Sequence, residues 1–222
     1  VVKKGSEIYV YEDDTVDPRE GVDEARKHKV EKSTIVYNDT ATKKYVDLNN
    51  LKKSFGMYSR QLAELPKTLD VSQKRAENDK IKVDLQTHNN YEITVKQTKD
   101  MAVLNLTADQ LSALDVNGGQ NLYVNFLGGT STEAGLLINV DLAGKTNFEL
   151  NGVVLEYDGN TPIGPDGSDI GEDGFGTNHN RIYWNFYDSS ESDKQYRGRV
   201  TLGAKVISSF ILPYGTLETH HN

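Results

Sequence analysis

The sequence predicts a mainly β protein with one long helix. Residues 81–157 carry short runs in which apolar and polar side chains alternate, as at Ile81, Val83 and Leu85, and such alternation is typical of strands. Turn residues separate these runs about every 10–15 residues. Only residues 47–65 show extended helical spacing. This pattern excludes a doubly wound α/β sheet and leaves a sandwich, a barrel or a solenoid.

The first 46 residues predict two short strands around a charged segment. Ile8 and Val10 alternate within one strand, and residues 35–37 predict a second. Residues 12–34 are dense in both charges and poor in apolar side chains. Such a segment cannot bury a face, so we expect a solvated excursion or a short exposed helix.

Residues 47–65 predict the flanking helix. Its apolar residues recur at spacings of three and four, which places them on one stripe; they are Leu48, Leu51, Phe55, Tyr58, Leu62 and Leu65. Asp47 suits the N-cap position, and Pro66 ends the run because the residue before proline disfavours the α region. We expect the apolar stripe to pack against the side of a sheet.

Several later segments carry local signals of their own. Residues 107–110 have a capping-box pattern that predicts a short helical turn. Residues 136–140 are nearly all apolar, which indicates a strand buried on both faces. Beyond the Asn151-Gly152 turn, we expect Val153, Leu155 and Tyr157 to share one face of a strand.

Composition limits the function classes. The net charge of −8 argues against nucleic-acid binding, which needs clustered Lys and Arg. No apolar run is long enough to insert in a membrane. The absence of cysteine excludes disulfides and thiolate chemistry. Twelve tyrosines suit half-exposed sheet faces and binding surfaces, although tyrosine is also ordinary in strands.

Five blocks between residues 47 and 222 carry a family resemblance through their order and spacing. They are residues 51–66, 102–111, 135–144, 181–188 and 203–215. The third contains Ile138-Asn139-Val140, and the fourth contains Trp184-Asn185-Phe186. Together these blocks resemble the bacterial choice-of-anchor A domain, a Gram-positive surface adhesin domain of the ice-binding-like β-solenoid family.

The resemblance implies a β-solenoid whose coils span 81–222, with the 47–65 helix packed alongside. It also implies a secreted domain, anchored to the cell wall through a signal outside this chain, and it brings no catalytic residues. The family has Gly-rich coils where this chain has its charged excursion, and a further coil after the position of Asn222. We therefore expect residues 1–222 to be a single adhesin domain that is trimmed at its end.

A candidate calcium site lies in residues 158–176, which hold five acidic residues and six glycines. Calcium prefers six to eight oxygen ligands, and glycine lets backbone carbonyls converge on the ion. The spacing does not match an EF-hand, and a solvated Gly-rich loop would explain the same composition. The candidate ligands are Asp166, Ser168, Asp169, Glu172 and Asp173.

Aromatic residues close to this loop are the candidate ligand-binding set. Trp184 and Phe186 share a parity on one strand and are expected in the core, whereas Tyr183 and Tyr187 fall on the other face. Aromatic platforms beside carboxylates and amides suit a glycan or an extended peptide. The candidate ligand-binding residues are Tyr183, Tyr187, Phe175 and Tyr196.

These features predict a non-enzymatic cell-surface adhesion domain that binds a host or environmental glycan or a matrix protein. We expect a monomeric module of a larger surface protein, with the loops at 12–34 and 158–179 available for recognition. No nucleophile motif, phosphate loop or zinc-ligand pattern occurs in the sequence. The alternatives are a polysaccharide-active β-helix enzyme and a structural stalk module without a ligand.

Overall fold

The computed structural model divides the chain into two compact units, Val1–Leu51 and Lys52–Asn222, and each is described by itself. The residues that the structure describes are 7–11, 34–39, 48–72, 74–86, 90–112, 114, 121–128, 133–158, 161–163, 181–204, 206 and 208–219.

The described part of the first unit is a two-stranded parallel sheet. β1 (Glu7–Tyr11) pairs with β2 (Thr34–Asp39), and Ile8 lies opposite Ile35. The two strands predicted near the N-terminus are therefore confirmed. The charged excursion predicted at 12–34 lies outside the described residues, apart from Thr34.

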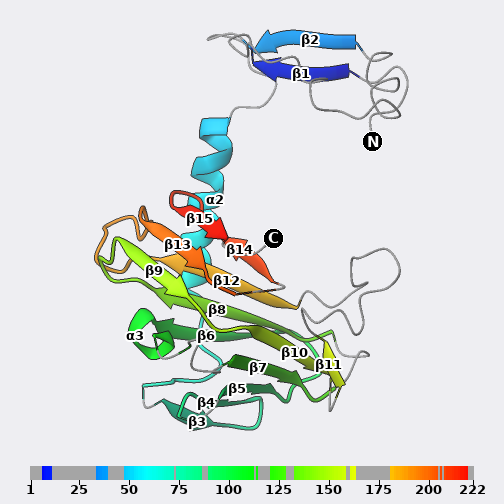
Figure 1. The fold of residues 1–222 in the computed structure, drawn as a ribbon, viewed down its shortest axis with the longest axis vertical. Coiled ribbons are helices and arrows are strands. Elements are labelled where there is room, and N and C mark those ends of the chain that lie inside the picture. The colour runs from blue at the N-terminus through cyan, green and yellow to red at the C-terminus, as the bar shows by residue number, and fades with distance from the viewer. Residues whose placement is uncertain are drawn as a thin grey trace. The chain divides into compact units, whose positions relative to one another are not determined.

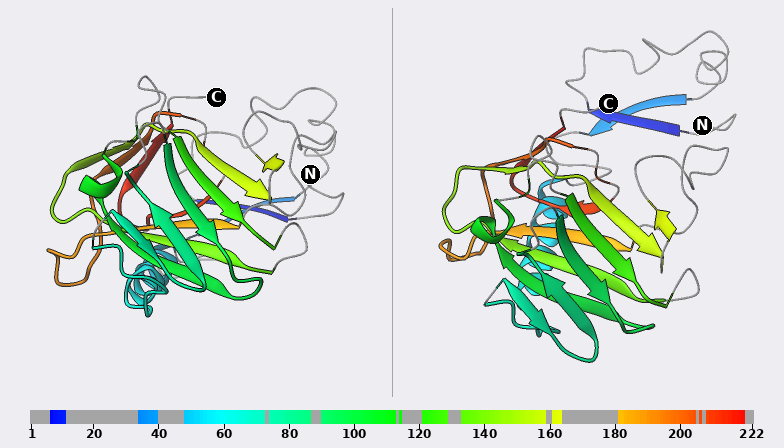
Figure 2. Two further views of the ribbon diagram at one scale, coloured as in Figure 1. Left: turned by 90° about the horizontal axis from the view of Figure 1, so that it is seen from below. Right: turned by 60° about the horizontal axis from the view of Figure 1, so that its bottom comes forward.

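The largest sheet of the second unit is mixed (Figure 1). In spatial order it contains β11 (Thr161–Ile163), β10 (Val154–Asp158), β7 (Asn121–Phe126), β5 (Asn90–Val95), β4 (Ile81–Asp84) and β3 (Arg75–Glu77). The three central strands β10, β7 and β5 are parallel, whereas the pairings at both edges are antiparallel. Figure 2 shows these strands side by side.

Two further sheets are entirely parallel. One contains β14 (Ser209–Ile211), β12 (Ile182–Tyr187), β8 (Gly135–Asp141) and β6 (Met101–Thr107); the other contains β15 (Thr216–Thr219), β13 (Arg199–Leu202) and β9 (Asn147–Leu150). β8 is buried over its first six residues, as its apolar run predicted.

The prediction of a β-solenoid is wrong. The protein is mainly β, but the strands of the second unit lie in three separate sheets, one mixed and two parallel, and none of them closes into a solenoid. The β3–β4–β5 and β10–β11 pairings are antiparallel hairpins, which reverse the chain within one sheet. Alternation in the sequence shows which side chains share a face, but it does not show which strands pair.

All three sheets contribute to one apolar core. Ile93 and Val124 enter it from the mixed sheet, Leu104 and Trp184 from the four-stranded sheet, and Val200 from the three-stranded sheet. Each of these side chains is fully buried, which is worth about 1.5–3 kcal/mol per large aliphatic side chain. Burial of this shared interior holds the sheets together.

The described residues include two helices, so the single long helix of the prediction is not the whole helical content. α2 (Leu48–Ala63) lies within the predicted range 47–65, and α3 (Ala108–Leu111) follows β6 directly. The capping box predicted for α3 is confirmed: Thr107 Oγ1 accepts from the amide of Gln110, and Gln110 Oε1 accepts from the amide of Thr107. No described helix has the length and apolar content that crossing a membrane would require.

The face on which α2 packs differs from the prediction. Its buried residues are Gly56, Ser59 and Ala63. Leu51, Phe55, Tyr58 and Leu65 of the predicted stripe are 39–51% exposed. Polar and close backbone contacts therefore anchor this helix, and the apolar stripe does not.

Gly56 is required where the helix approaches the loop before β15. A Cβ atom at this position would lie 2.6 Å from Cε2 of Tyr214 and 3.3 Å from Oε1 of Gln195. The side chains of Lys52 and Arg197 both lie over the Tyr214 ring, at 4.7 and 5.3 Å from its centroid, and restrain it.

We expect Gly56→Ala to destabilise the fold, although alanine is the better helix former by about 1 kcal/mol. The crowding costs about 1–3 kcal/mol, so a net loss of up to about 2 kcal/mol should appear in urea denaturation. Ser54→Ala, at an exposed position of the same helix, is the matched control and should change stability by only a few tenths of a kcal/mol. An increase in stability for Gly56→Ala would contradict this packing.

Candidate ligand-binding site

Three asparagines at one register position cross the four-stranded sheet. Asn105, Asn139 and Asn185 lie opposite one another on β6, β8 and β12. Asn185 Nδ2 donates to Asn139 Oδ1 at 2.9 Å, and Asn139 Nδ2 donates to Asn105 Oδ1 at 3.0 Å. We call these three residues the asparagine ladder.

The asparagine ladder also holds α2. Asn185 Nδ2 donates to the carbonyl of Ser59 at 2.9 Å, and its Oδ1 accepts from Ser59 Oγ at 2.6 Å. Asn139 Nδ2 donates to the carbonyl of Leu62 at 2.9 Å. Asn139, Asn185 and Ser59 have no exposed area. Because buried amides must be paired, the ladder determines where the helix sits on the sheet.

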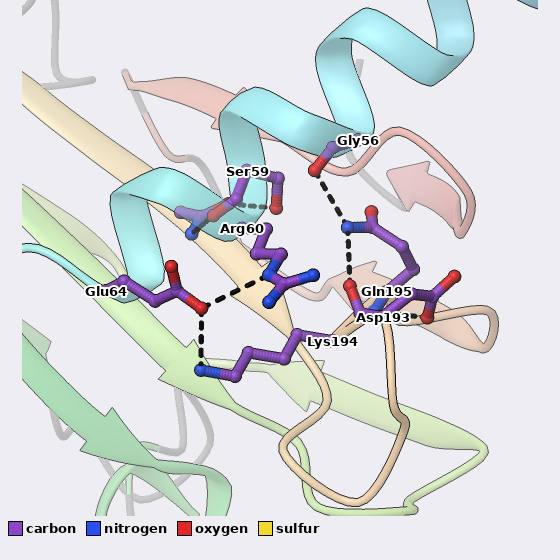
Figure 3. A network of polar contacts seen from close by, with 8 residues as sticks. Gly56, Ser59, Arg60, Glu64, Asp193, Lys194 and Gln195 are labelled. Carbon is purple, nitrogen blue, oxygen red and sulfur yellow. Dashed lines mark hydrogen bonds and ion pairs between the residues drawn. The ribbon is translucent and has the colours of Figure 1, made fainter.

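The loop that follows β12 also forms hydrogen bonds to α2 and to the residue just after it (Figure 3). Gln195 Nε2 donates to the carbonyl of Gly56 at 2.8 Å, and Lys194 Nζ donates to Glu64 at 3.1 Å. The hydrogen bonds from Lys194 and Arg60 lower the pKa of Glu64 below its ordinary value. The helix thereby fixes a loop that begins at the carboxyl end of the four-stranded sheet.

A row of polar residues ends the strands at that edge. Thr107 of β6 lies opposite Asp141 of β8, and Asp141 lies opposite Tyr187 of β12. Parallel strands bring their carboxyl ends to the same edge of a sheet, so three residues distant in sequence meet there. Asp141 Oδ1 accepts from the amides of Ala143 and Ser189, both at 3.0 Å. It thereby connects the turn after β8 with the turn after β12.

This row lines a cleft of about 420 Å³, which we call the Tyr187 cleft. Its polar lining comes from the three terminal residues and from the segments around them; it includes Lys67, Asp70, Ser72, Asn105 and Gln110. Carboxylate, hydroxyl and amide groups thus converge beside one aromatic side chain. Such a mixture can hydrogen-bond a polar ligand and pack against an apolar face of it.

A second cleft, of about 470 Å³, is formed in part by the turns after β8 and β12. We call it the Asp188 cleft. It is lined by residues 144–147 after β8, by Asp188, Glu191 and residues 195–199 around the loop after β12, and by Thr216. Asp188 follows Tyr187 directly, so adjacent residues of the chain line the two clefts.

The phenol of Tyr187 stays protonated over an extended pH range. Burial and the charge of Asp141 raise its pKa from 10.0 to about 12. The folded protein therefore keeps a proton that the unfolded chain loses near pH 10, and stability falls as pH rises from 10 to 12.

We expect this loss of stability to be smaller in Tyr187→Phe. The difference between the two proteins should reach about 1.3 kcal/mol at pH 11, measured by urea denaturation at pH 9 and pH 11. Burial also raises the pKa values of Tyr91 and Tyr196, but both proteins retain those residues, so their effect cancels. Equal losses in the two proteins would show that Tyr187 titrates normally.

Comparison with known proteins identifies the family. A protein-family model described as "Putative Ice-binding-like adhesive domain" matches residues 2–221. The chain belongs to this family. No curated protein and no solved structure matches it. Membership supports an adhesive, non-enzymatic role at a surface or extracellular location.

The adhesive domain places the predicted aromatic residues in different surroundings. Tyr187 lines the cleft named after it, and Tyr196 lines the Asp188 cleft, where its hydroxyl donates to the carbonyl of Arg199 at 3.0 Å. Tyr183 is half-buried on β12 and lines neither cleft. Phe175 lies outside the described residues. The assignment of Trp184 and Phe186 to the core is confirmed.

The candidate calcium ligands of the adhesive domain lie outside the part of the chain that the structure describes; they are Asp166, Ser168, Asp169, Glu172 and Asp173. Among the described residues, no group of three or more histidine, aspartate or glutamate side chains is placed to hold a metal ion. Calcium binding at 158–176 stays a prediction.

Sequence reasoning missed the residues that shape the two clefts of the adhesive domain. Thr107, Asp141 and Asp188 were not candidates, yet all three stand at or just after the carboxyl end of a parallel strand. A signal was present, because each is a polar residue that closes an apolar run. This signal identifies a site only if β6, β8 and β12 are known to be parallel neighbours, and the alternation of apolar residues does not show that.

Proposed function

We propose that this adhesive domain binds an extracellular glycan in the Tyr187 cleft. The observation that supports the proposal is the register that brings Thr107, Asp141 and Tyr187 to one edge of the four-stranded sheet. A rigid sheet holds all three backbones, so binding a ligand there requires little ordering of the protein.

The chemistry of the cleft suits a saccharide. Its volume of about 420 Å³ falls within the usual range of ligand pockets. Asp141 can accept hydrogen bonds from sugar hydroxyls, since a carboxylate offers about four acceptor sites and two are occupied here. The neutral phenol of Tyr187 supplies a donor, and the hydroxyl of Thr107, which donates to Gln110 Oε1, keeps an acceptor site. Sugar rings also have apolar faces, which can pack on an aromatic ring.

We further infer that the domain is a monomeric module of a Gram-positive surface protein of the choice-of-anchor A type, attached to the cell wall through a segment outside this chain. The resemblance of residues 135–144 and 181–188 to that family supports this narrower assignment. Residues 164–179 would extend the binding surface, and their carboxylates are candidate ligands of calcium. A thermal melt with and without millimolar calcium tests that last element, and an unchanged midpoint would contradict it.

Glycan binding is tested with an array that carries both glycans and matrix proteins, followed by calorimetry on the best ligand. We expect at least one glycan class to bind, and we expect Asp141→Asn and Tyr187→Phe to weaken it by about tenfold each, as for the loss of one good hydrogen bond. Tyr183→Phe changes a tyrosine of the same strand outside the cleft and should bind like the unmodified protein.

Two results would contradict the proposal. One is binding confined to matrix proteins. The other is glycan binding that neither cleft variant changes, which would move the site elsewhere. A depolymerisation assay on the bound glycan separates adhesion from polysaccharide cleavage, and we expect no shortening of the chains.

A further inference from the structure

We propose that the Asp188 cleft is an anion subsite that takes a carboxylate or sulfate group of the glycan held in the Tyr187 cleft. The ligand class is thereby an extended acidic glycan. This inference rests on the proposed function, but it concerns a different cleft with different residues.

The lining of the cleft includes three cationic residues, although the chain as a whole carries a net charge of −8. Lys145, Arg197 and Arg199 all line it. In the Tyr187 cleft, by contrast, one lysine faces two aspartates. Asp188 and Glu191 also line the Asp188 cleft, so its cations outnumber its carboxylates by one, and this excess favours an anionic group.

The acidic residues of the cleft do not oppose this preference strongly. Asp188 is 5% exposed, and its Oδ1 accepts from the amides of Gly144 and Ser190, both at 2.9 Å, and from Ser190 Oγ at 2.5 Å. Three donors thus compensate its charge inside the protein. Glu191 is exposed at the edge of the loop, where water screens it.

The cations remain available to a ligand. Their acidic partners are Asp109 for Lys145, Asp193 for Arg197 and Glu218 for Arg199, at 3.0, 2.7 and 3.3 Å, and the cationic side chains are 45–56% exposed. Arg197 is held further by the Gln195 carbonyl and the Tyr214 ring, so Lys145 and Arg199 are the more available cations. None of these three acidic partners lines the cleft. Exposed ion pairs of this kind contribute little, and an ammonium or guanidinium group has further N–H donors for a second anion.

Two glycines lie in the backbone of this cleft where other residues would be strained or crowded. Gly144 has a φ of +77°, and a Cβ atom at Gly198 would lie 2.3 Å from the carbonyl oxygen of Thr146 and 2.4 Å from the hydroxyl of Tyr196. Both glycines line the cleft. Their amides are therefore suitable reporters for a ligand that enters it.

The two clefts are close enough in the chain to share one ligand. Asp141 and Gly144 bracket a single turn, and Tyr187 and Asp188 are adjacent residues. A glycan of several sugar units that starts in one cleft would reach the other across that turn. Only the second cleft would then distinguish acidic from neutral glycans.

The test is a titration of the ¹⁵N-labelled full chain with three oligosaccharides of equal length, which are uronate-containing, sulfated and neutral. We expect all three to shift amides around Thr107 and Asp141, and at least one anionic ligand to shift Gly144 and Gly198 as well. The responses to the uronate and sulfate ligands then identify which anionic group is accepted. Arg199→Gln and Lys145→Gln should each weaken the anionic ligand by about tenfold and leave the neutral one unchanged.

Lys96→Gln is the matched control, because Lys96 also forms an exposed ion pair, with Glu77, but lies on the mixed sheet side of the fold and lines neither cleft. It should bind all three ligands like the unmodified protein. Equal affinity for anionic and neutral ligands, unaffected by Arg199→Gln, would overturn the anion subsite while glycan binding stands. No binding of any saccharide would overturn both proposals.

Discussion

Glu156→Ala is expected to lower the free energy of unfolding by about 3–5 kcal/mol, because it leaves a buried arginine without its carboxylate. Glu156 is 5% exposed and lies opposite the buried Val124, so its side chain enters the interior. There its Oε1 accepts from Nε of Arg181 at 2.7 Å, and the guanidinium lies 4.1 Å from the centre of the Phe126 ring.

The measurement for this variant is urea denaturation followed by fluorescence of the single, fully buried Trp184. For a chain of this length the midpoint of thermal unfolding should fall by roughly 10 °C. Glu77→Ala is the control, because it removes an ion pair whose glutamate is 56% exposed, and such pairs contribute at most about 1 kcal/mol.

A double replacement separates the cost of an unpaired charge from the value of the pair. Glu156→Leu combined with Arg181→Met removes both charges, and we expect it to recover most of the stability lost by Glu156→Ala. An equal loss of unfolding free energy in Glu156→Ala and Glu77→Ala would contradict the prediction. It would mean that water reaches Arg181 and that the Glu156–Arg181 pair is not part of the core.

Asn185→Leu is expected to destabilise the protein by about 2–4 kcal/mol through the groups that it leaves unpaired. Asn185 pairs the hydroxyl and the carbonyl of Ser59 on α2 and the side-chain oxygen of Asn139 on β8. Leucine has a similar volume but satisfies none of these three groups, all of which are buried.

The location of the effect distinguishes this prediction from general loss of the core. Because the asparagine ladder attaches α2, amide hydrogen exchange should accelerate first over residues 56–63 and later in the sheets. Asn147→Leu, at an exposed position of β9, should change stability by less than about 0.5 kcal/mol. A double-mutant cycle with Ser59→Ala should give a coupling of about 1 kcal/mol or more, and zero coupling would contradict the contact.

Local patterns in the sequence were sufficient for several elements. The alternation at Ile81, Val83 and Leu85 marks β4, and these side chains are buried as expected. The capping box at Thr107 and Gln110 depends only on residues three apart, and it forms as predicted. In these cases the interactions that decide the structure lie within a few residues of one another.

The same patterns failed where distant residues decide which face is buried. Val153, Leu155 and Tyr157 were expected to share one apolar face, yet the structure buries Val154 and Glu156, while Val153 and Leu155 are half-buried. Arg181, which is distant in sequence, makes this register possible because it supplies the partner that a buried carboxylate needs. A hydrophobicity pattern treats glutamate as exposed and cannot anticipate that partner.

Spacing and capping are local properties of the chain, so they were enough to predict a mainly β protein and the positions of most strands and helices; the adhesive domain was predicted by the resemblance of five ordered blocks. The division of the strands among three sheets, the buried face of α2 and the residues that meet at the two clefts could be seen only in the folded chain. Those outcomes depend on pairing between distant segments: a parallel register aligns Thr107, Asp141 and Tyr187, and buried asparagines must find partners wherever the fold provides them.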